Sequence, residues 1–453
     1  MIITKLKAVA EKIPYPIGRL SSRIPYSWRL GSTYSEYSRL IPIVENANAE
    51  HRNAYIIKML DSIVRHAQQH IPFYQSLYGK DPLKIESLSD FDKLPVISRN
   101  QVREYAKESS GAYFLNTGGS TGGPLYFYVD RNAWAREWAH MHYVWRRRHY
   151  KPTDLMVTML GKPLSSGLSK YNAVHNELLL DPYSPIERGA AEFIKLVRAY
   201  PIRFFQGYPS NIYNVFKAAE QYIKTELRKE FAKNIKGLLF SSEYPSEYMV
   251  QYLREEWGLF NYMSWYGHSE MCVLAYDLKS NYNYKPLFTY GYAEEQNGML
   301  IGTSFHNYDM PLIRYQTEDI ISAIKDNSGV ISSFQITGGR VSDFIEDKKG
   351  QQHSLTFFLG RHHTIYNHAD FIQIYQGIPG FATYYIVPSH DFRPSSDDLS
   401  FYFDIPQNLD IVFDYCLIKK PIRTKSGKFK LKLTKDDIYT LEDEAGRAFL
   451  KRD

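Results

Sequence analysis

A glycine-rich segment at residues 116–124, Asn-Thr-Gly-Gly-Ser-Thr-Gly-Gly-Pro, is the feature that most constrains how this chain folds. Glycine has no Cβ, so neighbouring backbone N–H groups in such a segment can converge on one anion. The Ser and Thr hydroxyls add hydrogen-bond donors without adding charge. Because strand-like runs flank the segment, we predict a strand–loop–strand cradle for a polyphosphate, with an ordinary glycine-rich hairpin turn as the alternative.

Two other interpretations of this segment are less favoured. The pattern Gly118-x-Ser120-x-Gly122 matches the nucleophile elbow of serine hydrolases, which requires a strand before the serine and a helix after it. Residues 124–130, Pro-Leu-Tyr-Phe-Tyr-Val-Asp, instead predict a second strand, because aromatic and β-branched side chains favour strands. A Walker A loop is excluded, since no lysine follows Gly122.

Composition places the chain among ordinary globular proteins with more than one domain. It has 453 residues, of which 44% are hydrophobic and 23% charged. Two cysteines, Cys272 and Cys416, cannot make a disulfide framework, which favours a reducing, cytoplasmic location. No run approaches the roughly 18 apolar residues of a membrane span, and no Cys/His pattern predicts a transition-metal site.

The positive charge of the chain is concentrated at its start. Residues 1–43 contain seven Lys and Arg residues but only two Glu residues, although the whole chain has a net charge of +6. We interpret this segment as a solvated basic arm packed on the body, with weak contact with an anionic membrane surface, peripheral to the inner membrane, as the alternative. The rest of the chain is nearly neutral, so we expect no nucleic acid as a partner.

Hydrophobic periodicity predicts an α/β fold. Beyond Gly338-Gly339-Arg340 the chain changes to shorter strand-like runs and turns, which predicts three parts: the arm at 1–43, a large domain at 44–341 and a small α+β domain at 342–453. The predicted helices span 46–71, 131–149 and 209–233, and the predicted strands span 153–160, 236–241, 260–265, 299–304 and 330–336.

One predicted helix carries a row of aromatic side chains. Trp134, Trp138, His142 and Trp145 fall on roughly one face of the segment 131–149. Such a row is more often part of a hydrophobic core than of a ligand site. We therefore interpret it as core, with one wall of a substrate pocket as the alternative.

Four further motifs follow the glycine-rich segment. A carboxylate that follows a strand, as in the first two motifs, suits Mg²⁺ or ribose hydroxyls, and a lysine on a glycine-bearing turn suits a phosphate. Each motif alone is typical of a solvated turn. The motifs are Tyr266-Gly267-His268-Ser269-Glu270, Arg314-Tyr315-Gln316-Thr317-Glu318-Asp319, Gly339-Arg340-Val341-Ser342-Asp343 and Arg423-Thr424-Lys425-Ser426-Gly427-Lys428.

Together the five motifs, in this order, resemble the adenylate-forming superfamily. The closer resemblance is to the phenylacetate–coenzyme A ligase family and its CapK-type branch, named for capsular polysaccharide loci. Local support comes from Ile71-Pro72-Phe73-Tyr74, from Leu94-Pro95-Val96-Ile97-Ser98-Arg99 and from Gly-Gly-Ser-Thr-Gly in the phosphate loop. The resemblance covers residues from about 55 to 435 and implies a large N-terminal domain with a small mobile α+β C-terminal domain.

The resemblance also implies roles for the residues that match the motifs of the family. Val341–Asp343 would be the hinge, although Ser342 stands where the family usually has an acidic residue, and Gly123 stands where many members carry lysine. The implied roles are ATP phosphate binding by Thr117, Gly118, Gly119, Ser120, Thr121 and Gly122; adenine contact by Ser242, Glu243, Tyr266 and Gly267; ribose binding by Asp319 and Arg340; Mg²⁺ binding by Glu270; and catalysis of adenylation by Lys428 and Glu270.

The implied reaction uses ATP and Mg²⁺ to convert a carboxylic acid to acyl-AMP with release of pyrophosphate. The acyl group would then pass to a thiol, with CoA as one candidate, or to an amine. The branch likeness places this reaction in surface polysaccharide biosynthesis. The alternatives are an inactive scaffold that keeps the fold and a serine hydrolase that uses Ser120.

Overall fold

The computed structural model divides the chain into two compact units, Met1–Ile336 and Thr337–Asp453. The boundary expected at 341–342 lies outside the described residues, so the three-part division stays a prediction. The structure describes residues 13–116, 125–159, 164, 166–181, 186–241, 247–278, 281–338, 344–348, 352–354, 358, 364–389, 392, 394, 396–403, 405, 410–423, 432–435 and 437–438.

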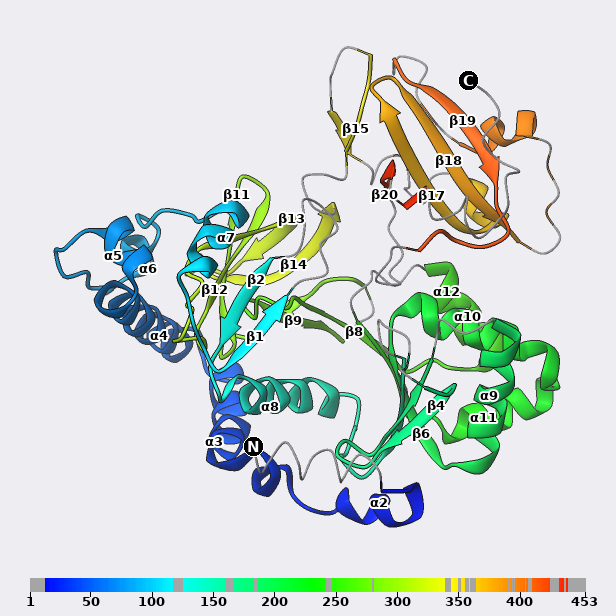
Figure 1. The fold of residues 1–453 in the computed structure, drawn as a ribbon, viewed down its shortest axis with the longest axis horizontal. Coiled ribbons are helices and arrows are strands. Elements are labelled where there is room, and N and C mark those ends of the chain that lie inside the picture. Colours follow the sequence, from blue (N-terminus) through cyan, green and yellow to red (C-terminus); the bar gives the residue numbers. More distant parts are fainter. Residues whose placement is uncertain are drawn as a thin grey trace. The chain divides into compact units, whose positions relative to one another are not determined.

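An eight-stranded mixed sheet organises the larger part of the first unit (Figure 1). Its strands are β3 (Leu155–Met159), β4 (Ser169–Asn172), β5 (Glu177–Leu180), β6 (Ile202–Gly207), β7 (Gly237–Phe240), β8 (Tyr262–Gly267), β9 (Leu274–Asp277) and β10 (Lys285–Pro286). Their order is β10-β9-β8-β7-β6-β3-β5-β4. The strands from β8 to β5 in this order pair in parallel, so the carboxyl ends of β3, β6, β7 and β8 share one edge.

Helices cover both faces of this sheet, because alternate side chains of a strand point to opposite faces. Phe205 and Leu238 belong to the core formed with the helices α9–α12, which Figure 1 shows gathered on one side. Their neighbours Phe204 and Leu239 pack instead against α8. These helices are α8 (Ala133–Arg146), α9 (Ile186–Ala199), α10 (Pro209–Ala219), α11 (Thr225–Asn234) and α12 (Glu247–Trp257).

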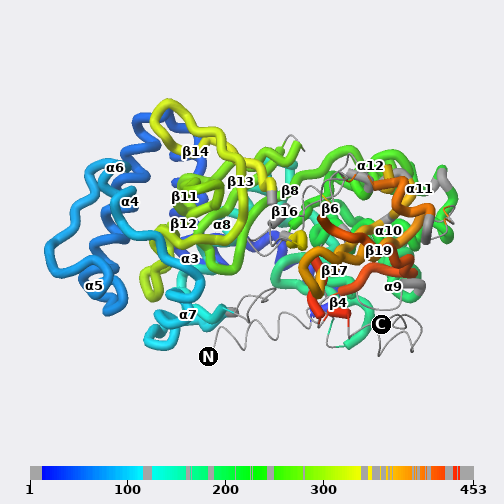
Figure 2. The backbone as a smooth tube through the Cα atoms, turned by 90° about the horizontal axis from the view of Figure 1, so that it is seen from above, coloured from blue at the N-terminus to red at the C-terminus, as the bar shows by residue number. Residues whose placement is uncertain are grey.

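The remainder of the first unit contains a four-stranded sheet, a hairpin and shorter helices. Apolar side chains of α4, Ile56, Leu60 and Ile63 among them, share one core with the four-stranded sheet, and the two lie close together in Figure 2. These elements are α4 (Ala49–His70), α5 (Pro72–Tyr78), α6 (Leu88–Phe91), α7 (Arg99–Lys107), β1 (Tyr113–Asn116), β2 (Tyr126–Val129), β11 (Gly291–Gln296), β12 (Met299–Ser304), β13 (Tyr315–Lys325) and β14 (Ile331–Gly338).

The second unit is built on a four-stranded sheet in the order β19-β18-β17-β20. Strands β17 and β18 are antiparallel, and Ile374, Tyr384 and Ile386 belong to its buried core. Its described elements are β15 (Phe344–Glu346), β16 (Gln352–Ser354), η2 (Thr364–Asn367), β17 (Ala369–Ile378), β18 (Phe381–Pro388), η3 (Ser396–Tyr402), β19 (Val412–Leu417) and β20 (Lys432–Leu433).

The helix predicted over 209–233 is wrong as one element. Helix α10 ends at Ala219, a 3₁₀ turn (η1, Glu220–Tyr222) follows, and α11 begins only at Thr225. Ile223 and Lys224 between them have extended backbone angles. Tertiary contacts explain the break, because Glu220 receives a hydrogen bond from Tyr252 at 2.6 Å and an ion pair from Arg228 at 3.0 Å.

Residues 15–45 are packed on the rest of the first unit. They form α2 (Tyr15–Ser21) and α3 (Tyr26–Glu45), and α3 is interrupted at Gly31, whose φ of 79° favours glycine. Tyr26, Tyr34 and Ile41 form a small core with Ala135 and Ala139 of α8. Helix α3 therefore continues through residue 43, where the predicted basic arm ends.

The aromatic row of α8 lies mostly in the core. Trp145 and His142 are buried, Trp138 is half-buried and only Trp134 is exposed. The Nδ1 atom of His142 hydrogen-bonds the Tyr34 hydroxyl at 2.8 Å. Burial, assisted by the charge of Arg146, lowers the pKa of His142 to about 3, so this imidazole is neutral in the folded protein.

Replacement of His142 by glutamine should make the protein less sensitive to acid. At about pH 5 the unfolded chain, with an ordinary pKa of 6.5, binds a proton at His142 that the folded chain does not bind. Its contribution to stability is complete above about pH 6.5 and is lost as the pH falls. When the pH falls from about 8 to about 5, the unfolding free energy of the parent should therefore decrease by about 2 kcal/mol more than that of His142→Gln. Urea unfolding at both pH values tests this, with the exposed His70→Gln as control; equal pH dependence of the two variants would contradict the assignment.

Among the described residues, no helix combines the length and the apolar character needed to cross a bilayer.

Candidate functional site

The first element of the candidate site is the turn that follows β8. Strand β8 ends at Gly267, and the chain returns through Met271, whose φ is 55°, into the antiparallel strand β9. The turn holds His268 and Glu270 next to the carboxyl edge of the parallel strands. In open α/β sheets this edge is where ligands bind.

Glu270 is a buried carboxylate surrounded by three polar side chains. Its Oε2 lies 3.3 Å from Nδ1 of His268, and its Oε1 lies 3.6 Å from a guanidinium nitrogen of Arg99. The Tyr315 hydroxyl donates to Oε1 at 3.3 Å. All three distances exceed the 2.7–2.9 Å typical of charge-assisted hydrogen bonds, so these groups surround the carboxylate without forming short hydrogen bonds to it.

The surroundings of Glu270 keep it ionised. Burial alone would raise its pKa, but the imidazole of His268 and the positive charge of Arg99 outweigh burial and lower the pKa to about 2. A carboxylate that is both buried and ionised at neutral pH is available to bind a cation or to accept hydrogen bonds. The described residues contain no group of three or more His, Cys, Asp or Glu side chains placed to hold a metal ion.

Arg99 reaches Glu270 because the segment before α7 is attached to β13. The backbone of Ile97 makes two hydrogen bonds on either side of Tyr315, the first residue of β13, donating to the Arg314 carbonyl at 2.9 Å and accepting from the Gln316 N–H at 3.0 Å. The Arg314 guanidinium donates to the Leu94 carbonyl and forms a buried ion pair with Glu294 at 2.9 Å. Helix α7 then begins at Arg99, after a capping box made by Ser98 and Gln101.

Tyr266 and Asp319 form the second part of the site. The Tyr266 hydroxyl donates to Oδ2 of Asp319 at 2.5 Å. Burial and the neighbouring Asp319 charge both raise the pKa of Tyr266, so the phenol stays protonated and remains the donor. The Tyr266 ring lies edge-on to His268 at 5.9 Å, which connects this pair with Glu270.

A β-bulge directs Asp319 toward Tyr266. Met299 of β12 pairs with Ile320, whereas Ile301 pairs with Gln316, so β13 contains extra residues between these pairs. Glu318 within the bulge has a φ of 69°, which is uncommon for a residue other than glycine. Bulges of this kind often redirect a side chain beside an active site.

The strands on either side of the glycine-rich segment confirm part of the sequence prediction. Strands β1 and β2 form an antiparallel hairpin in which Asn116 pairs with Tyr126. A strand therefore follows Ser120 where the nucleophile elbow of a serine hydrolase would need a helix. Residues 117–124 themselves lie outside the described residues.

The structure thus brings together Tyr266, Gly267, Glu270 and Asp319 from the predicted site. Gly267 is exposed beside Tyr266. The predicted residues Thr117, Gly118, Gly119, Ser120, Thr121, Gly122, Ser242, Glu243, Arg340 and Lys428, and the predicted hinge Val341–Asp343, lie outside the described residues.

The sequence motifs do not reveal the partners of Glu270. Arg99, His268 and Tyr315 each lie within one of the sequence motifs, and this membership is a signal that could have marked them as site residues. The motifs do not predict the pairing of Ile97 with β13. This pairing brings Arg99 to the carboxylate of Glu270, which lies 171 positions further along the chain.

Comparison with solved structures identifies the fold. The chain superimposes on 2-hydroxyisobutyryl-CoA ligase in the postadenylation state, in complex with R3-HIB-AMP, with a TM-score of 0.64 and 16% identity over 89% of this chain and 94% of that one. It also superimposes on the GH3.15 acyl acid amido synthetase, with a TM-score of 0.61 and 13% identity over 87% and 94% of the two chains. No protein-family model and no curated protein sequence matches the chain.

A third match is an ATP-bound RpMatB-BxBclM chimera, with a TM-score of 0.51 and 12% identity over 73% of this chain and 68% of that one. These structures are adenylate-forming enzymes, and the chain has their α/β fold with a separate C-terminal unit. The particular solved structures that it resembles include an acid–thiol ligase and an acid–amine ligase.

Proposed function

We propose that this protein is an ATP-dependent carboxylic-acid ligase that forms acyl-AMP and pyrophosphate and then transfers the acyl group to a thiol or an amine. The observation that carries the proposal is the cluster of Glu270, Tyr266 and Asp319. These side chains come from two of the five ordered motifs and lie together at the ligand-binding edge of an adenylate-forming fold.

The chemistry of the cluster fits a nucleotide. Asp319, held by the Tyr266 hydroxyl, would accept hydrogen bonds from the ribose hydroxyls, and Tyr266 with Gly267 would line the adenine. The donors proposed for the phosphates and the ribose outside the described residues are the 117–122 loop and Arg340. Ser242 and Glu243 are proposed on the adenine side.

The donor set also fits Mg²⁺. This ion is usually held by one or two protein carboxylates together with substrate phosphates, and it needs no cage of protein ligands. Glu270 provides one such carboxylate, ionised at neutral pH by its surroundings. When bound, Mg²⁺ would supply positive charge that offsets the charge of the triphosphate.

Lys428 is proposed to favour adenylation through its ammonium group. The negative charge that develops when a carboxylate attacks the α-phosphate needs donors that are already in place. The Val341–Asp343 hinge would allow the C-terminal unit to adopt different arrangements for the two half-reactions.

The acceptor and the pathway remain part of the proposal. The 2-hydroxyisobutyryl-CoA ligase has been solved with 2-HIB-AMP and CoA, and GH3.15 is an acyl acid amido synthetase, so both a thiol and an amine have precedent in this fold. A place in surface polysaccharide biosynthesis, in the cytoplasm, rests on the resemblance to the CapK-type branch. Exchange of labelled pyrophosphate into ATP, measured across a panel of carboxylic acids, tests the first half-reaction without knowledge of the acceptor. Acid-dependent exchange is expected; ATP binding without exchange for any acid would favour the inactive scaffold.

Ser120→Ala should weaken the use of ATP only moderately. In a phosphate loop the serine hydroxyl is one donor among several backbone N–H groups, so we expect a KM for ATP raised by about tenfold and measurable turnover. A serine nucleophile would behave differently, because its removal abolishes activity and the parent reacts with a fluorophosphonate probe. Covalent labelling of the parent at Ser120, absent in Ser120→Ala, would contradict the ligase assignment.

A further inference from the structure

A corner formed by α2 and the start of α3 exposes four large apolar side chains within twelve residues. The exposed fractions are 62% for Ile17, 59% for Leu20, 46% for Ile24 and 81% for Trp28. Single exposed apolar residues are normal, but a group of them marks an interaction surface. We call these four residues the apolar corner.

The opposite side of α2 is packed on the body of the first unit. At about 100° per residue, Ile17 and Leu20 fall on one side of the helix, roughly opposite the buried Gly18, and Ile24 follows in the turn between α2 and α3. A Cβ at Gly18 would come within 2.6 Å of the Tyr171 ring, so α2 lies very close to β4. Helix α2 is therefore amphipathic, with its apolar corner directed away from the core.

Arg29 holds the corner in place. Its guanidinium and Nε donate to the carbonyls of Ser21 at 2.5 Å, Ile24 at 2.9 Å and Val174 at 2.7 Å. The Ser21 hydroxyl donates to the Ala173 carbonyl at 2.6 Å. These bonds join α2, α3 and the body, so the apolar corner is a preorganised surface.

The charges around the corner are positive. Residues 12–35 contain no Asp or Glu, and the exposed Arg19 and Arg23 flank the apolar side chains. Within the part of the chain that the structure describes, neither guanidinium pairs with a carboxylate. An apolar surface bordered by arginines complements an anionic lipid interface.

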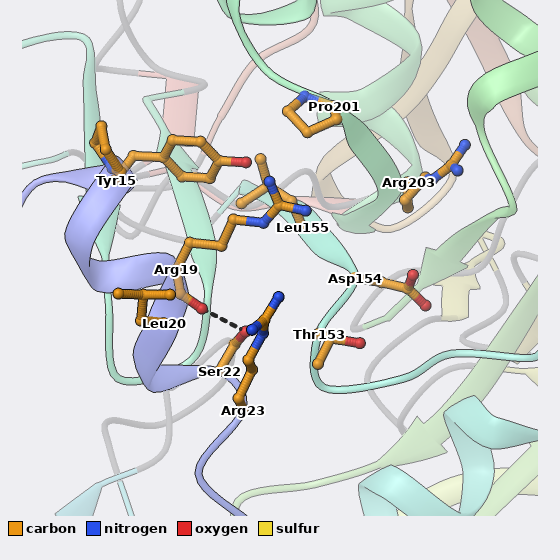
Figure 3. Close-up of a pocket in the computed structure, with 11 residues that line it drawn as sticks. Tyr15, Arg19, Leu20, Ser22, Arg23, Thr153, Asp154, Leu155, Pro201 and Arg203 are labelled. Atoms are coloured by element: carbon orange, nitrogen blue, oxygen red, sulfur yellow. Dashed lines mark hydrogen bonds between the residues drawn. The ribbon is translucent and has the colours of Figure 1, made fainter.

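A pocket of about 590 Å³ opens beside these arginines, between α2 and the starts of β3 and β6 (Figure 3). Figure 3 shows the Tyr15 hydroxyl and the guanidinium groups of Arg19 and Arg23 turned toward the same space. Among the described residues, the buried Tyr15 hydroxyl has no hydrogen-bond partner. Asp154 in the wall is offset by Lys236 at 2.8 Å, so the arginines dominate the charge of the pocket.

The pocket and the candidate site lie at opposite edges of the same sheet. Thr153 and Asp154 precede β3, and Pro201 precedes β6, so the pocket is at the amino ends of the parallel strands. Glu270 follows β8, at the carboxyl ends. A surface that contacts the amino edge leaves the candidate site free.

We propose that the apolar corner binds the surface of an anionic phospholipid membrane, with its four side chains in the interface and the headgroup phosphates at Arg19 and Arg23. Burial of apolar side chains and attraction by basic residues are two weak contributions that together give stable, reversible binding. Neither contribution requires a spanning helix. The proposal concerns attachment to a surface and does not depend on the reaction at Glu270.

Vesicle flotation with the full chain tests the proposal. One set of vesicles contains phosphatidylcholine alone, and the other contains phosphatidylcholine mixed with phosphatidylglycerol. We expect binding to the mixed vesicles that weakens with added salt. Leu20→Ser/Trp28→Ser and, separately, Arg19→Glu/Arg23→Glu should each weaken the partition by at least about tenfold.

Matched variants elsewhere provide the controls. Phe260→Ser removes a side chain that is 70% exposed, and Lys224→Glu/Lys229→Glu makes the same charge change at exposed positions. Both should bind within about twofold of the parent. All the altered side chains are exposed, so thermal unfolding should confirm that each variant is folded.

Three outcomes would overturn the proposal. The first is equal binding to neutral and anionic vesicles. The second is absence of flotation together with stabilisation by inorganic phosphate of the parent but not of Arg19→Glu/Arg23→Glu. The third is self-association of the parent without vesicles that Leu20→Ser/Trp28→Ser abolishes. The last would assign the apolar corner to a second copy of the chain.

Discussion

Replacement of Glu270 by glutamine should lower acid-dependent pyrophosphate exchange by at least about a hundredfold, which is the usual scale for loss of one preorganised charge. The substitution keeps the shape of the side chain but removes the charge proposed to hold Mg²⁺. The expected signature is a shift of the Mg²⁺ dependence to higher concentrations, measured by titrating the exchange rate at saturating ATP.

Stability must be separated from chemistry in this experiment, because Glu270 also neutralises the buried Arg99. Loss of one member of a buried ion pair commonly costs about 3–5 kcal/mol. The double variant Glu270→Gln/Arg99→Gln removes both charges, so it should recover part of the lost unfolding free energy. Exchange should stay low in the double variant; if exchange recovered with stability, Glu270 would be a structural residue only.

Glu294→Gln offers a matched control in the same unit. Glu294 is buried and paired with Arg314, as Glu270 is with Arg99, but burial raises its pKa to about 7 in spite of that arginine. A residue that is partly protonated near neutral pH loses less when it becomes an amide. We expect exchange within a few-fold of the parent and an unchanged Mg²⁺ dependence.

Replacement of Lys428 by alanine should lower the formation of acyl-AMP by at least about a hundredfold, with a nearly unchanged Tm. Lysine at this position of the Arg-Thr-x-x-Gly-Lys motif is proposed to act only in adenylation. The second half-reaction, started from supplied acyl-AMP and acceptor, should therefore remain within a few-fold of the parent.

Lys425→Ala, three residues earlier in the same motif, is the matched control for Lys428. It removes the same charge from the same segment and should leave adenylation within a few-fold of the parent. Equal losses in the two variants, or equal losses in both half-reactions of Lys428→Ala, would contradict the catalytic role.

Local pattern was sufficient for many of the elements. The apolar spacing over 46–71 predicted α4, observed at Ala49–His70, because helical periodicity is a property of the segment itself. The strand-like residues on either side of the glycine-rich segment predicted β1 and β2 for the same reason. The order of the motifs predicted the fold, which the solved adenylate-forming structures confirm.

Contacts between distant segments decided the rest. The helix predicted over 209–233 breaks at Glu220, which accepts a hydrogen bond from Tyr252 of α12, and the apolar spacing within the segment does not predict that contact. The amphipathic character of α2 likewise depends on a distant contact, because Gly18 packs against Tyr171 of β4. In each case the stabilising contact joins groups that are far apart in the sequence.

The amino-acid sequence by itself therefore determined the fold class, and it supplied the acidic and aromatic residues proposed for the candidate site, since these follow from local pattern and from motif order. Only the tertiary structure decided how those residues act together. Two backbone hydrogen bonds between Ile97 and the start of β13 bring Arg99 to Glu270, and a bulge in β13 turns Asp319 toward Tyr266. The ionised state of Glu270 depends on that arrangement, because a buried carboxylate keeps its charge only where positive or hydrogen-bonding groups surround it.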